Sequence, residues 1–574
     1  MKPGIKFVGI FLILILMVYP AKAFVKITDL VFDGMSVDPT ELSEILETIK
    51  QNKKTNLKNE LLGKKKRLPT KLTIIEAKQK DPKNIQIEID TSGVVVKTEE
   101  DIQAPISNIN FLNAIQDAIN LWKNVDVADI DFLPLKFGSG QPNPDDGKNI
   151  ITFRATGQTE LEGIPENSSA FTIITYAKTN NIIFMNKPIM VKPGTILDAD
   201  IIFDPSNDPC LALHTTTGDF KTGGDEAPIA DGGIDPDADL SMCDFPHSGD
   251  ITDLAVSSIA HLLGLESSPV ASSANSSVAQ IMTRYSLTND DRISLANLYP
   301  KKEALINFGR VIGKVTLNKK PVTGTHVVLQ DSASGEPVTS TISNLNGKFE
   351  IKYVPAGTYT VYIEPLDGPI RKNSLNLNFF GFNSQINFVT RLLESTITVS
   401  AKKTTNLKNI EVQELSASSF NINYNTAVLT EEDINESGGS FILPIRIMQG
   451  EILTDVPFWG SNINPSFGTL SISGQGLSVT NVRENKSIPI SPFFTCTQCD
   501  DTPTSMCNRD PRCDPALAID VEPDEIPGIL VDITCDPGTP FGPRNIIFTG
   551  DVLETTNPSF GLRDQITGGI IVTE

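Results

Sequence analysis

The sequence predicts a multidomain protein in which an α/β domain, a mixed sheet with three helices, is followed by two all-β sandwich modules. Between residues 83 and 300, strand-like runs alternate with amphipathic helix patterns, as in domains whose helices pack on a sheet. From residue 305 onward, short β-type runs are separated by Gly, Asn and Pro, and no helix pattern remains. A chain of 574 residues is also longer than one hydrophobic core usually organises.

Residues 1–23 have the pattern of a secretory signal peptide. Lys2 and Lys6 precede an apolar run that ends in the small-residue sequence Ala-Lys-Ala at 21–23. We therefore expect an exported protein whose mature chain begins near Phe24 and that is secreted into an extracellular or periplasmic space. No later stretch approaches the ~20 apolar residues of a membrane span, so we expect no membrane insertion.

The charge of the chain limits the classes of partner. A formal net charge of −22 argues against nucleic acid or an anionic membrane, because either would require a basic surface. Residues 24–82 are the exception, since the stretch 50–83 carries twelve Lys and Arg. We interpret this region as a solvated N-terminal arm or linker, with a docking patch as the alternative. The expected partner is an unknown protein or surface ligand.

The cysteines also fit an exported protein, in which they are expected to form disulfides. Two of them flank an acidic loop and five cluster late in the chain, so one thiol of the odd total is left free or intermolecular. The spacing of Cys496 and Cys499 matches a zinc or redox motif, but the Pro-, Asp- and Thr-rich surroundings favour a disulfide-stapled loop. The seven candidates are Cys210, Cys243, Cys496, Cys499, Cys507, Cys513 and Cys535.

Hydrophobic periodicity places the elements of the α/β domain. Helices are expected at 110–124, at about 250–265 and at 287–299, the last with Thr288 or Asn289 as N-cap and acidic residues in its first turn. Strands are expected at 85–93, 130–137, 149–154, 170–176, 181–191 and in 194–209.

The second helix contains the sequence most informative about chemistry, SSIAHLLGLESSP at 257–269. A zincin site needs two His residues four apart on one helix face and a Glu beside the first as general base. The metzincin form adds a Gly, a third ligand and a Met-containing turn. Laid over HExxHxxGxxH, the chain offers Ser257, Ser258, His261, Gly264 and Ser267.

Residues 83–300 resemble the matrixin branch of the metzincins, the M10-type peptidases. The resemblance rests on HLLGL at 261–265, on IMTRYS with Met282 in the place of a Met-turn, and on the closing LTNDDRISLANLYP. AIQDAINLW and ILDADIIFDP occur upstream in the matching order. The resemblance implies a metzincin-like α/β fold and a metallopeptidase ancestry.

The departures from the motif decide the expected function. A Ser hydroxyl is a poor zinc ligand, so replacing two of three ligands should remove most zinc affinity. Ser258 at the general-base position cannot take a proton from metal-bound water as a carboxylate does. We therefore expect a noncatalytic pseudoprotease with a binding or structural role and without zinc. The alternative is a secreted zinc metalloendopeptidase with a non-standard ligand set that draws on Glu266, His214 or His247.

Three other interpretations of this region remain. Ser257 and His261 are spaced for a hydroxyl–imidazole pair, but no orienting acid or oxyanion hole is evident. The stretch 257–265 could also be an ordinary packing helix. Separately, the loop 225–253 holds nine acidic residues and no Lys or Arg, so Asp235, Asp237 and Asp239 could bind calcium, which matrixin-like domains commonly do.

The last two domains resemble known β modules. Residues 309–366 resemble the carboxypeptidase regulatory-like, transthyretin-type domain, with Gly313, Gly324 and Gly347 at turns or tight strand positions, and we expect this module to span 305–415. Residues 416–574 resemble an immunoglobulin-like domain of the TIG or IPT kind that carries the Cys-rich insertion. Such modules supply spacers or adhesion units, not catalytic groups.

Overall fold

The structure is a computed structural model of the 574-residue chain. It describes residues 14–17, 28–32, 35–36, 72–90, 108–138, 142–143, 146–153, 170–203, 211–214, 247–266, 268–276, 286–367, 384–415, 421–424, 444–461, 463–466, 468–487, 526–550 and 563–573. Among these residues no helix is long and apolar enough to cross a bilayer.

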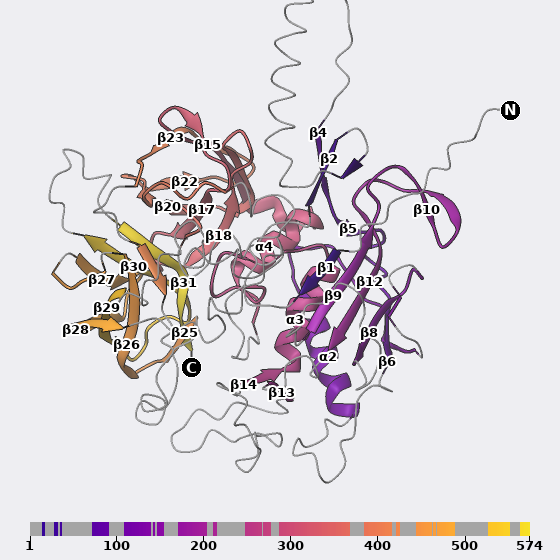
Figure 1. Cartoon of the computed structure of the whole chain (residues 1–574), viewed down its shortest axis with the longest axis horizontal. Helices are drawn as coiled ribbons and strands as arrows, with labels where there is room; N and C mark the ends of the chain where they lie inside the picture. Colours follow the sequence, from indigo (N-terminus) through magenta and orange to yellow (C-terminus); the bar gives the residue numbers. More distant parts are fainter. Residues whose placement is uncertain are drawn as a thin grey trace, which may run out of the picture.

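A seven-stranded mixed sheet forms the centre of the first domain (Figure 1). Its strands are β1 (Leu14–Met17), β5 (Lys78–Gln79), β6 (Ile87–Asp90), β7 (Lys136–Phe137), β8 (Asn149–Phe153), β9 (Ala170–Tyr176) and β12 (Thr195–Phe203). The order is β1-β9-β12-β8-β6-β7, with β5 also paired to β12. β12, β8 and β6 are parallel neighbours, while β9 is antiparallel to β12. Both β9 and β12 are almost entirely buried, as their apolar sequences require.

Two helices pack on this sheet, and their contact is fixed by a long-range hydrogen bond. They are α2 (Asn108–Lys123) and α3 (Ile251–Leu262). Trp122, which the helical periodicity placed on the buried face of α2, donates from Nε1 to the carbonyl of Val256 at 2.9 Å. Phe111 of α2 meets Phe203 of β12 edge-to-face, with ring centroids 5.8 Å apart. The predicted amphipathic helix is therefore present and in the core.

The third helix, α4 (Asn289–Leu298), joins the first domain to the second. Thr288 is its N-cap and forms a capping box with Asp291. Tyr299, which follows the helix, donates to the carbonyl of Leu263 at 2.6 Å and accepts from the backbone of Gln79. These bonds connect the end of α4 to the end of α3 and to β5.

The N-terminal region contains strands where the sequence indicated a leader and an arm. β1 lies inside the expected signal peptide and pairs antiparallel with the outer edge of β9. The expected basic arm contains the sheet β3-β2-β4, made of β2 (Thr28–Phe32), β3 (Met35–Ser36) and β4 (Leu72–Glu76). The apolar runs TDLVF and LTIIE explain why part of this basic segment forms strands.

The stretch 181–191, expected as one strand, is a hairpin of β10 (Asn181–Phe184) and β11 (Lys187–Met190). The two residues between them, Met185 and Asn186, have positive φ of 50° and 58°. The prediction of one strand was wrong because Met is an uncommon residue for this type of turn, which favours Asn and Gly.

The second domain is a β-sandwich. Its strands are β15 (Phe308–Leu317), β16 (Lys320–Pro321), β17 (His326–Asp331), β18 (Pro337–Ile342), β19 (Lys348–Pro355), β20 (Gly357–Glu364), β21 (Arg391–Leu392), β22 (Ile397–Val399) and β23 (Thr404–Val412). One sheet is β16-β15-β19 with β23, and the other is β18-β17-β20-β21 with β22. A Cβ on Gly313 would collide with the ring of Phe349, so the position must be Gly.

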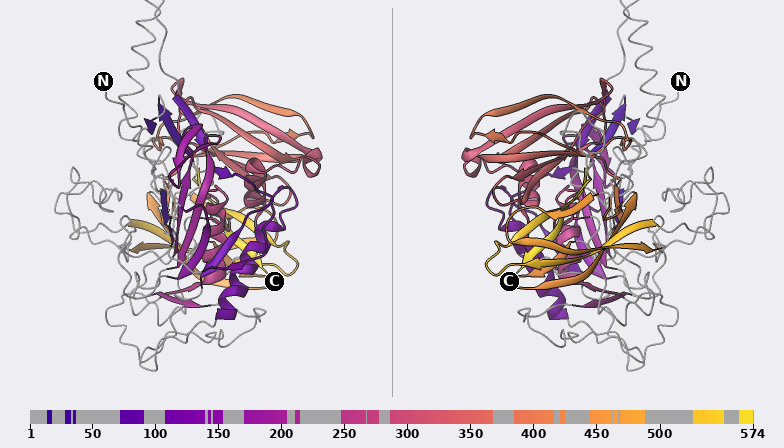
Figure 2. Two further views of the ribbon diagram at one scale, coloured as in Figure 1. Left: turned by 90° about the vertical axis from the view of Figure 1, so that its right-hand side faces the viewer. Right: turned by 90° about the vertical axis from the view of Figure 1, so that its left-hand side faces the viewer.

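The third domain is a second sandwich, made of β24-β26-β29-β28 and β25-β31-β30-β27. Its strands are β24 (Asn421–Tyr424), β25 (Ile445–Met448), β26 (Ile452–Ser461), β27 (Gly468–Ile472), β28 (Leu477–Ser487), β29 (Ile526–Cys535), β30 (Gly542–Gly550) and β31 (Arg563–Thr573). Ala271, a residue of the first domain, belongs to its hydrophobic core. The expected pair of all-β sandwiches is thus present, and the three domains pack against one another (Figure 2).

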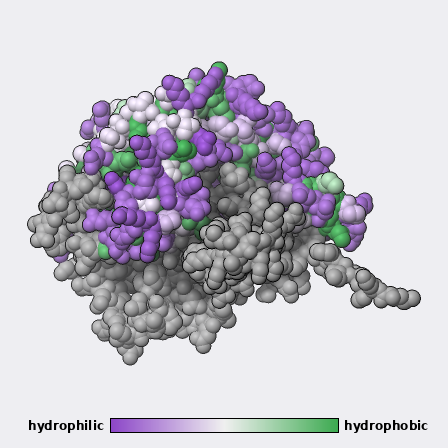
Figure 3. All heavy atoms as spheres, turned by 90° about the horizontal axis from the view of Figure 1, so that it is seen from above, coloured by the Kyte–Doolittle hydropathy of each residue, from purple (hydrophilic) through white to green (hydrophobic). Residues whose placement is uncertain are grey.

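The described surface is mostly hydrophilic when seen from above, and its apolar areas are small (Figure 3). This agrees with the high charge of the chain, since scattered apolar side chains on a surface are normal and only grouped ones call for an explanation.

Candidate functional site

The stretch that resembles a zinc motif begins on the last turns of α3, and Gly264 follows the end of the helix. Gly264 has φ of +91°, and a Cβ there would collide with the carbonyl oxygen of Ala77. Only Gly fits this position, because it both adopts a positive φ and lets the two backbones approach. The chain therefore turns sharply three residues after His261.

His261 is buried, with 1% of its surface exposed. Its Nδ1 lies 2.8 Å from the carbonyl oxygen of Leu265. A carbonyl can only accept, so Nδ1 carries the proton and Nε2 carries the lone pair. Zinc-binding His residues commonly donate to a carbonyl in this way, but a buried structural His is satisfied by the same bond.

The two Ser residues at the motif positions of the first ligand and the base have different surroundings. The Ser257 hydroxyl donates to Oδ1 of Asn275 at 2.7 Å. Ser258 is completely buried, and its carbonyl accepts from the Thr172 hydroxyl of β9 at 3.3 Å. Its own Oγ has no hydrogen-bond partner among the described residues. A hydroxyl held by an amide and a hydroxyl inside the core are both unsuited to activating water.

The segment 268–276 after the motif is buried and heavily hydrogen-bonded. Its Ser268 hydroxyl donates to Asp290 at 2.8 Å, and its Ser273 hydroxyl donates to Asp291 at 2.5 Å. Asn275 Nδ2 donates to the carbonyl of Glu266 at 2.9 Å. Burial raises the pKa of Asp290 to about 7, and the neighbouring charge of Asp291 adds to the shift. The two carboxylates in the first turn of α4 therefore hold the segment 268–276 in place. From the sequence they were expected only to stabilise the start of the helix, so this contact was missed.

The same segment connects the first domain to the third. The backbone N–H of Ala271 donates to the carbonyl of Thr567 in β31 at 2.8 Å. A Cβ on Gly568, whose φ is +68°, would collide with Ser272. The loop and β31 are thus packed backbone to backbone.

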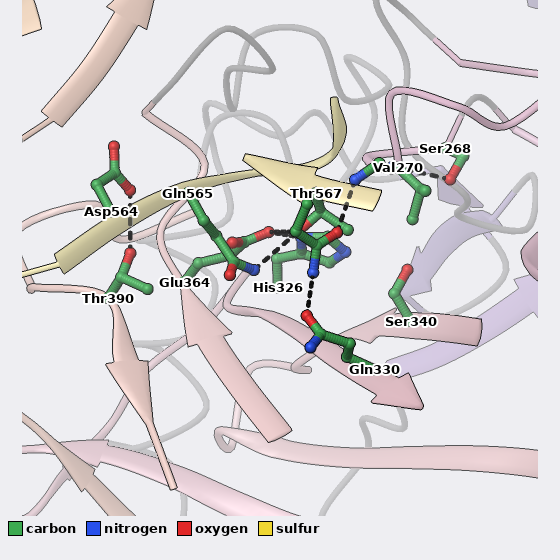
Figure 4. Close-up of polar contacts among 12 residues, drawn as sticks. Ser268, Val270, His326, Gln330, Ser340, Glu364, Thr390, Asp564, Gln565 and Thr567 are labelled. Atoms are coloured by element: carbon green, nitrogen blue, oxygen red, sulfur yellow. Dashed lines mark hydrogen bonds and ion pairs between the residues drawn. The ribbon is translucent and has the colours of Figure 1, made fainter. Parts of the chain in front are cut away.

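A buried polar cluster continues from this contact between the second and third domains (Figure 4). His326 of β17 pairs with Glu364 of β20, and Thr567 donates to the same carboxylate at 2.9 Å. Asn545 of β30 donates to Gln330 at 2.6 Å and accepts from the backbone of Gly568 at 2.8 Å. The cluster joins the two domains, because its hydrogen bonds run from β30 and β31 to β17 and β20. His326 Nε2, Glu364 Oε2 and Gln565 Oε1 have no hydrogen-bond partner among the described residues.

The backbones of two alternative ligands, His214 and His247, lie beside the start of α3. His214 ends β13 (Leu211–His214) and pairs with Asp250, the last residue of β14 (His247–Asp250), just before α3. His261 lies eleven residues further along, roughly 16 Å at 1.5 Å per residue. The idea that His214 and His247 complete a site with His261 therefore conflicts with their position at the opposite end of the helix.

Several predicted residues lie outside the described residues. They are Ser267, Met282, Asp235, Asp237, Asp239, Cys210, Cys243, Cys496, Cys499, Cys507 and Cys513. Cys535 is described, and it lies buried at the end of β29 without a disulfide to any other described residue. Within the described ranges, no group of three or more His, Cys, Asp or Glu side chains is arranged to hold a metal.

A second pair of buried carboxyls with raised pKa values lies on the central strand β12. Asp198 and Asp200 are both fully buried. Asp198 accepts from the backbone of Gly147 at 2.6 Å, and Asp200 accepts from the backbone of Ile150 at 3.0 Å. Burial and the charge of Asp200 raise the pKa of Asp198 to about 9, and burial raises the pKa of Asp200 to about 7. The sequence feature that could have revealed this pair is the spacing of the two Asp residues, at i and i+2 within TILDADIIF, which places both on one face of an apolar strand.

Comparisons with known proteins do not identify the chain. No family model matches it, and no curated protein does. Among solved structures, the Bacillus anthracis TIE protein is 13% identical over 19% of this chain and 17% of its own, with a TM-score of 0.14. The major pilin BcpA of Bacillus cereus is 10% identical over 46% and 69%, with a TM-score of 0.14. The major pilin SpaD of Corynebacterium diphtheriae is 8% identical over 45% and 64%, with a TM-score of 0.13. The chain spans less than two thirds of the length of the TIE protein and of SpaD. Structural similarities this weak carry no argument about function.

Proposed function

We propose that this chain is an exported, noncatalytic binding or structural protein built on a degenerate matrixin-like α/β domain. The observation that carries the proposal is the state of the motif on α3. Ser257 is engaged by Asn275, Ser258 is buried in the core, and His261 is the one imidazole of the motif. A hydrolytic site needs several metal ligands and a base, and these side chains supply neither.

The mixed sheet with α2, α3 and α4 supports the matrixin-like assignment in a general way. The two sandwiches likewise support the assignment of transthyretin-type and immunoglobulin-type modules. Rigid sandwiches of this kind suit spacing or adhesion.

A binding role would use the outer edge of β9. This edge accepts an antiparallel strand, since Leu14↔Ile174 and Met17↔Phe171 are paired in the full chain. Export with cleavage near Phe24 would remove β1 and open the edge to an extended segment of a partner. The side chains of β9 are buried, so the backbone would supply most of the contacts.

The alternative is a secreted zinc metalloendopeptidase with a non-standard ligand set. One observation favours it, the tautomer of His261, in which Nε2 holds the lone pair that a metal would take. Calcium in the acidic loop 225–253 stays a separate proposal.

Metal analysis and a cleavage assay on the purified protein test the choice. We expect no stoichiometric zinc and no chelator-sensitive cleavage of casein. Calcium without zinc would support the structural role. Stoichiometric zinc together with chelator-sensitive cleavage that His261→Ala abolishes would overturn the proposal in favour of the alternative. N-terminal sequencing of the secreted form tests cleavage near Phe24.

A further inference from the structure

The β10–β11 hairpin has one face that packs on the protein and one apolar face that does not. In its register, Ile183 is opposite Pro188, and Phe184 is opposite Lys187. Phe184 is buried and lies beside Gly147, with contact distance to a Cβ there of 3.3 Å. Because side chains alternate along a strand, Ile183, Pro188 and Met190 share the other face.

That outer face and the tip are exposed. Met190 is 83% exposed, Met185 is 51% exposed and Ile183 is 46% exposed. Figure 3 shows apolar surface beside hydrophilic surface at the right-hand end of the molecule, where Figure 1 places this hairpin. Three large apolar side chains within eight residues form a group, unlike the isolated apolar residues expected on any surface.

The turn of the hairpin holds an apolar residue, Met185, in a backbone conformation that is unfavourable for it. Met185 and Asn186 both have positive φ, at 50° and 58°. Asn tolerates this conformation, but a long side chain such as Met does not favour it. Met185 is half exposed, and its sulfur lies beside Gly147, 3.4 Å from the position of a Cβ there, so one part of the side chain packs on the protein and the rest faces solvent.

The hairpin is also basic in an otherwise acidic protein. Residues 177–197 contain Lys178, Lys187 and Lys192 and no Asp or Glu, whereas the whole chain has a net charge of −22. Lys187 and Lys192 are exposed, and neither forms an ion pair with any part of the chain that the structure describes. Their charge is available to an anionic partner.

We infer that the β10–β11 hairpin is a docking element for an anionic phospholipid surface, with Ile183, Met185 and Met190 entering the headgroup region and Lys187 and Lys192 contacting lipid phosphates. Lysines flanking a small apolar tip are suited to this, because their stems lie along the apolar region while their charges stay at the headgroups. The net charge opposes binding by the chain as a whole. Screening restricts that repulsion to about 10 Å, and the hairpin lies at an extremity of the molecule (Figure 1).

Two other occupants fit the hairpin less well. A stable protein interface usually covers roughly 800 Å² on each partner, far more than three side chains expose, whereas a fluid bilayer needs no matching shape. A symmetric contact between two hairpins of two copies would bring their lysines together, so like charges would oppose it. Anionic lipid is therefore the partner that the size and charge of the surface favour.

Vesicle co-sedimentation tests the inference with the purified protein. We expect binding to vesicles of equal parts phosphatidylglycerol and phosphatidylcholine, weak binding to phosphatidylcholine alone, and loss of binding at high salt. Met190→Asn should weaken binding about tenfold, since it removes one apolar side chain that the bound lipid would bury. Lys187→Gln and Lys192→Gln should each weaken it about fivefold. The matched controls are Ile452→Thr, at a 60% exposed apolar site of the third domain, and Lys320→Gln in the second.

Three results would overturn the inference. One is the absence of sedimentation with anionic vesicles. Another is sedimentation that the hairpin variants leave unchanged, which would place the lipid contact elsewhere, for instance in the basic stretch 50–83. A third is a dimer in light scattering that Met190→Asn dissociates, which would make a second copy the occupant. Because the hairpin variants change exposed side chains, unchanged circular dichroism would show that they fold.

Discussion

The buried carboxyl pair of β12 predicts an unusual pH dependence of stability for the first domain. The unfolded chain releases Asp protons near pH 4, while the folded protein retains them to about 7 at Asp200 and to about 9 at Asp198. A folded-state pKa above the unfolded value means that the folded state binds more protons. The free energy of unfolding must therefore fall as pH rises through this window, and stability is greatest in mild acid.

The size of the effect follows from linkage. Each retained proton changes the free energy of unfolding by about 1.4 kcal/mol per pH unit, so the two protons of this pair over about two units contribute at most about 5.5 kcal/mol. Water entry and relaxation around Asp198 and Asp200 lower this bound, and we expect a loss of about 2 kcal/mol between about pH 5 and pH 7. Asp198→Asn keeps an acceptor for the N–H of Gly147 but cannot ionise, so it should remove about half of this loss.

Urea unfolding followed by tryptophan fluorescence measures the effect. The chain has two Trp residues, and Trp459→Phe leaves Trp122, in the core of the first domain, as the reporter. Chelator in every sample removes cations that would keep the carboxylates ionised. Asp117→Asn, at an exposed position of α2, is the matched control. The reasoning is refuted if stability is constant or rises from about pH 5 to pH 7, or if Asp198→Asn has the same pH slope as the control.

Three further predictions concern the motif and the interdomain joint. Gly264→Ala should lower the free energy of unfolding by at least about 2 kcal/mol in calorimetry, because it adds a collision with Ala77 to the cost of a positive φ. The control Gly538→Ala, with φ of +84° and open space around it, should cost about 1 kcal/mol. Equal losses in the two variants would contradict this reasoning. Ala271→Asp places an unpaired charge in the core of the third domain, which should break the contact through which the first and third domains unfold together. Calorimetry should then show separate transitions for these two domains. One unchanged transition would disprove their coupling through Ala271. Ser257→His combined with Ser267→His completes the HxxxHxxGxxH spacing with His261, and on the proposed matrixin-like fold we expect zinc binding in isothermal titration that Ser257→His alone lacks. No gain in zinc binding would argue against that proposal.

Local patterns predicted the parts of the fold that local sequence controls. The periodicity around Trp122 predicted α2, and Thr288 ahead of two Asp residues predicted the start of α4, because helix faces and caps depend on residues three or four apart. The same reasoning failed at Met185, where tertiary context holds a turn in a conformation that the residue does not favour.

Long-range contacts account for what sequence reasoning missed at the candidate site. The bond between Ala271 and Thr567 joins residues almost three hundred positions apart, and no local pattern reports it. Asp290 and Asp291 fit a helix N-terminus in the sequence, yet they are fully buried and hold the segment 268–276. The sequence shows Asp198 and Asp200 as two charged residues within an apolar strand. It does not show that the backbone of Gly147 donates to Asp198, because the two positions are far apart in the chain.

The joint formed by segment 268–276, β31 and the His326–Glu364 pair also has a mechanical meaning. It links all three domains through buried backbone and side-chain bonds instead of a solvated linker. The β10–β11 hairpin and the strands of the third domain lie at opposite ends of the view in Figure 1. Domains joined in this way hold a fixed distance and orientation, so a surface bound at one end and a partner bound at the other would be kept at a constant separation.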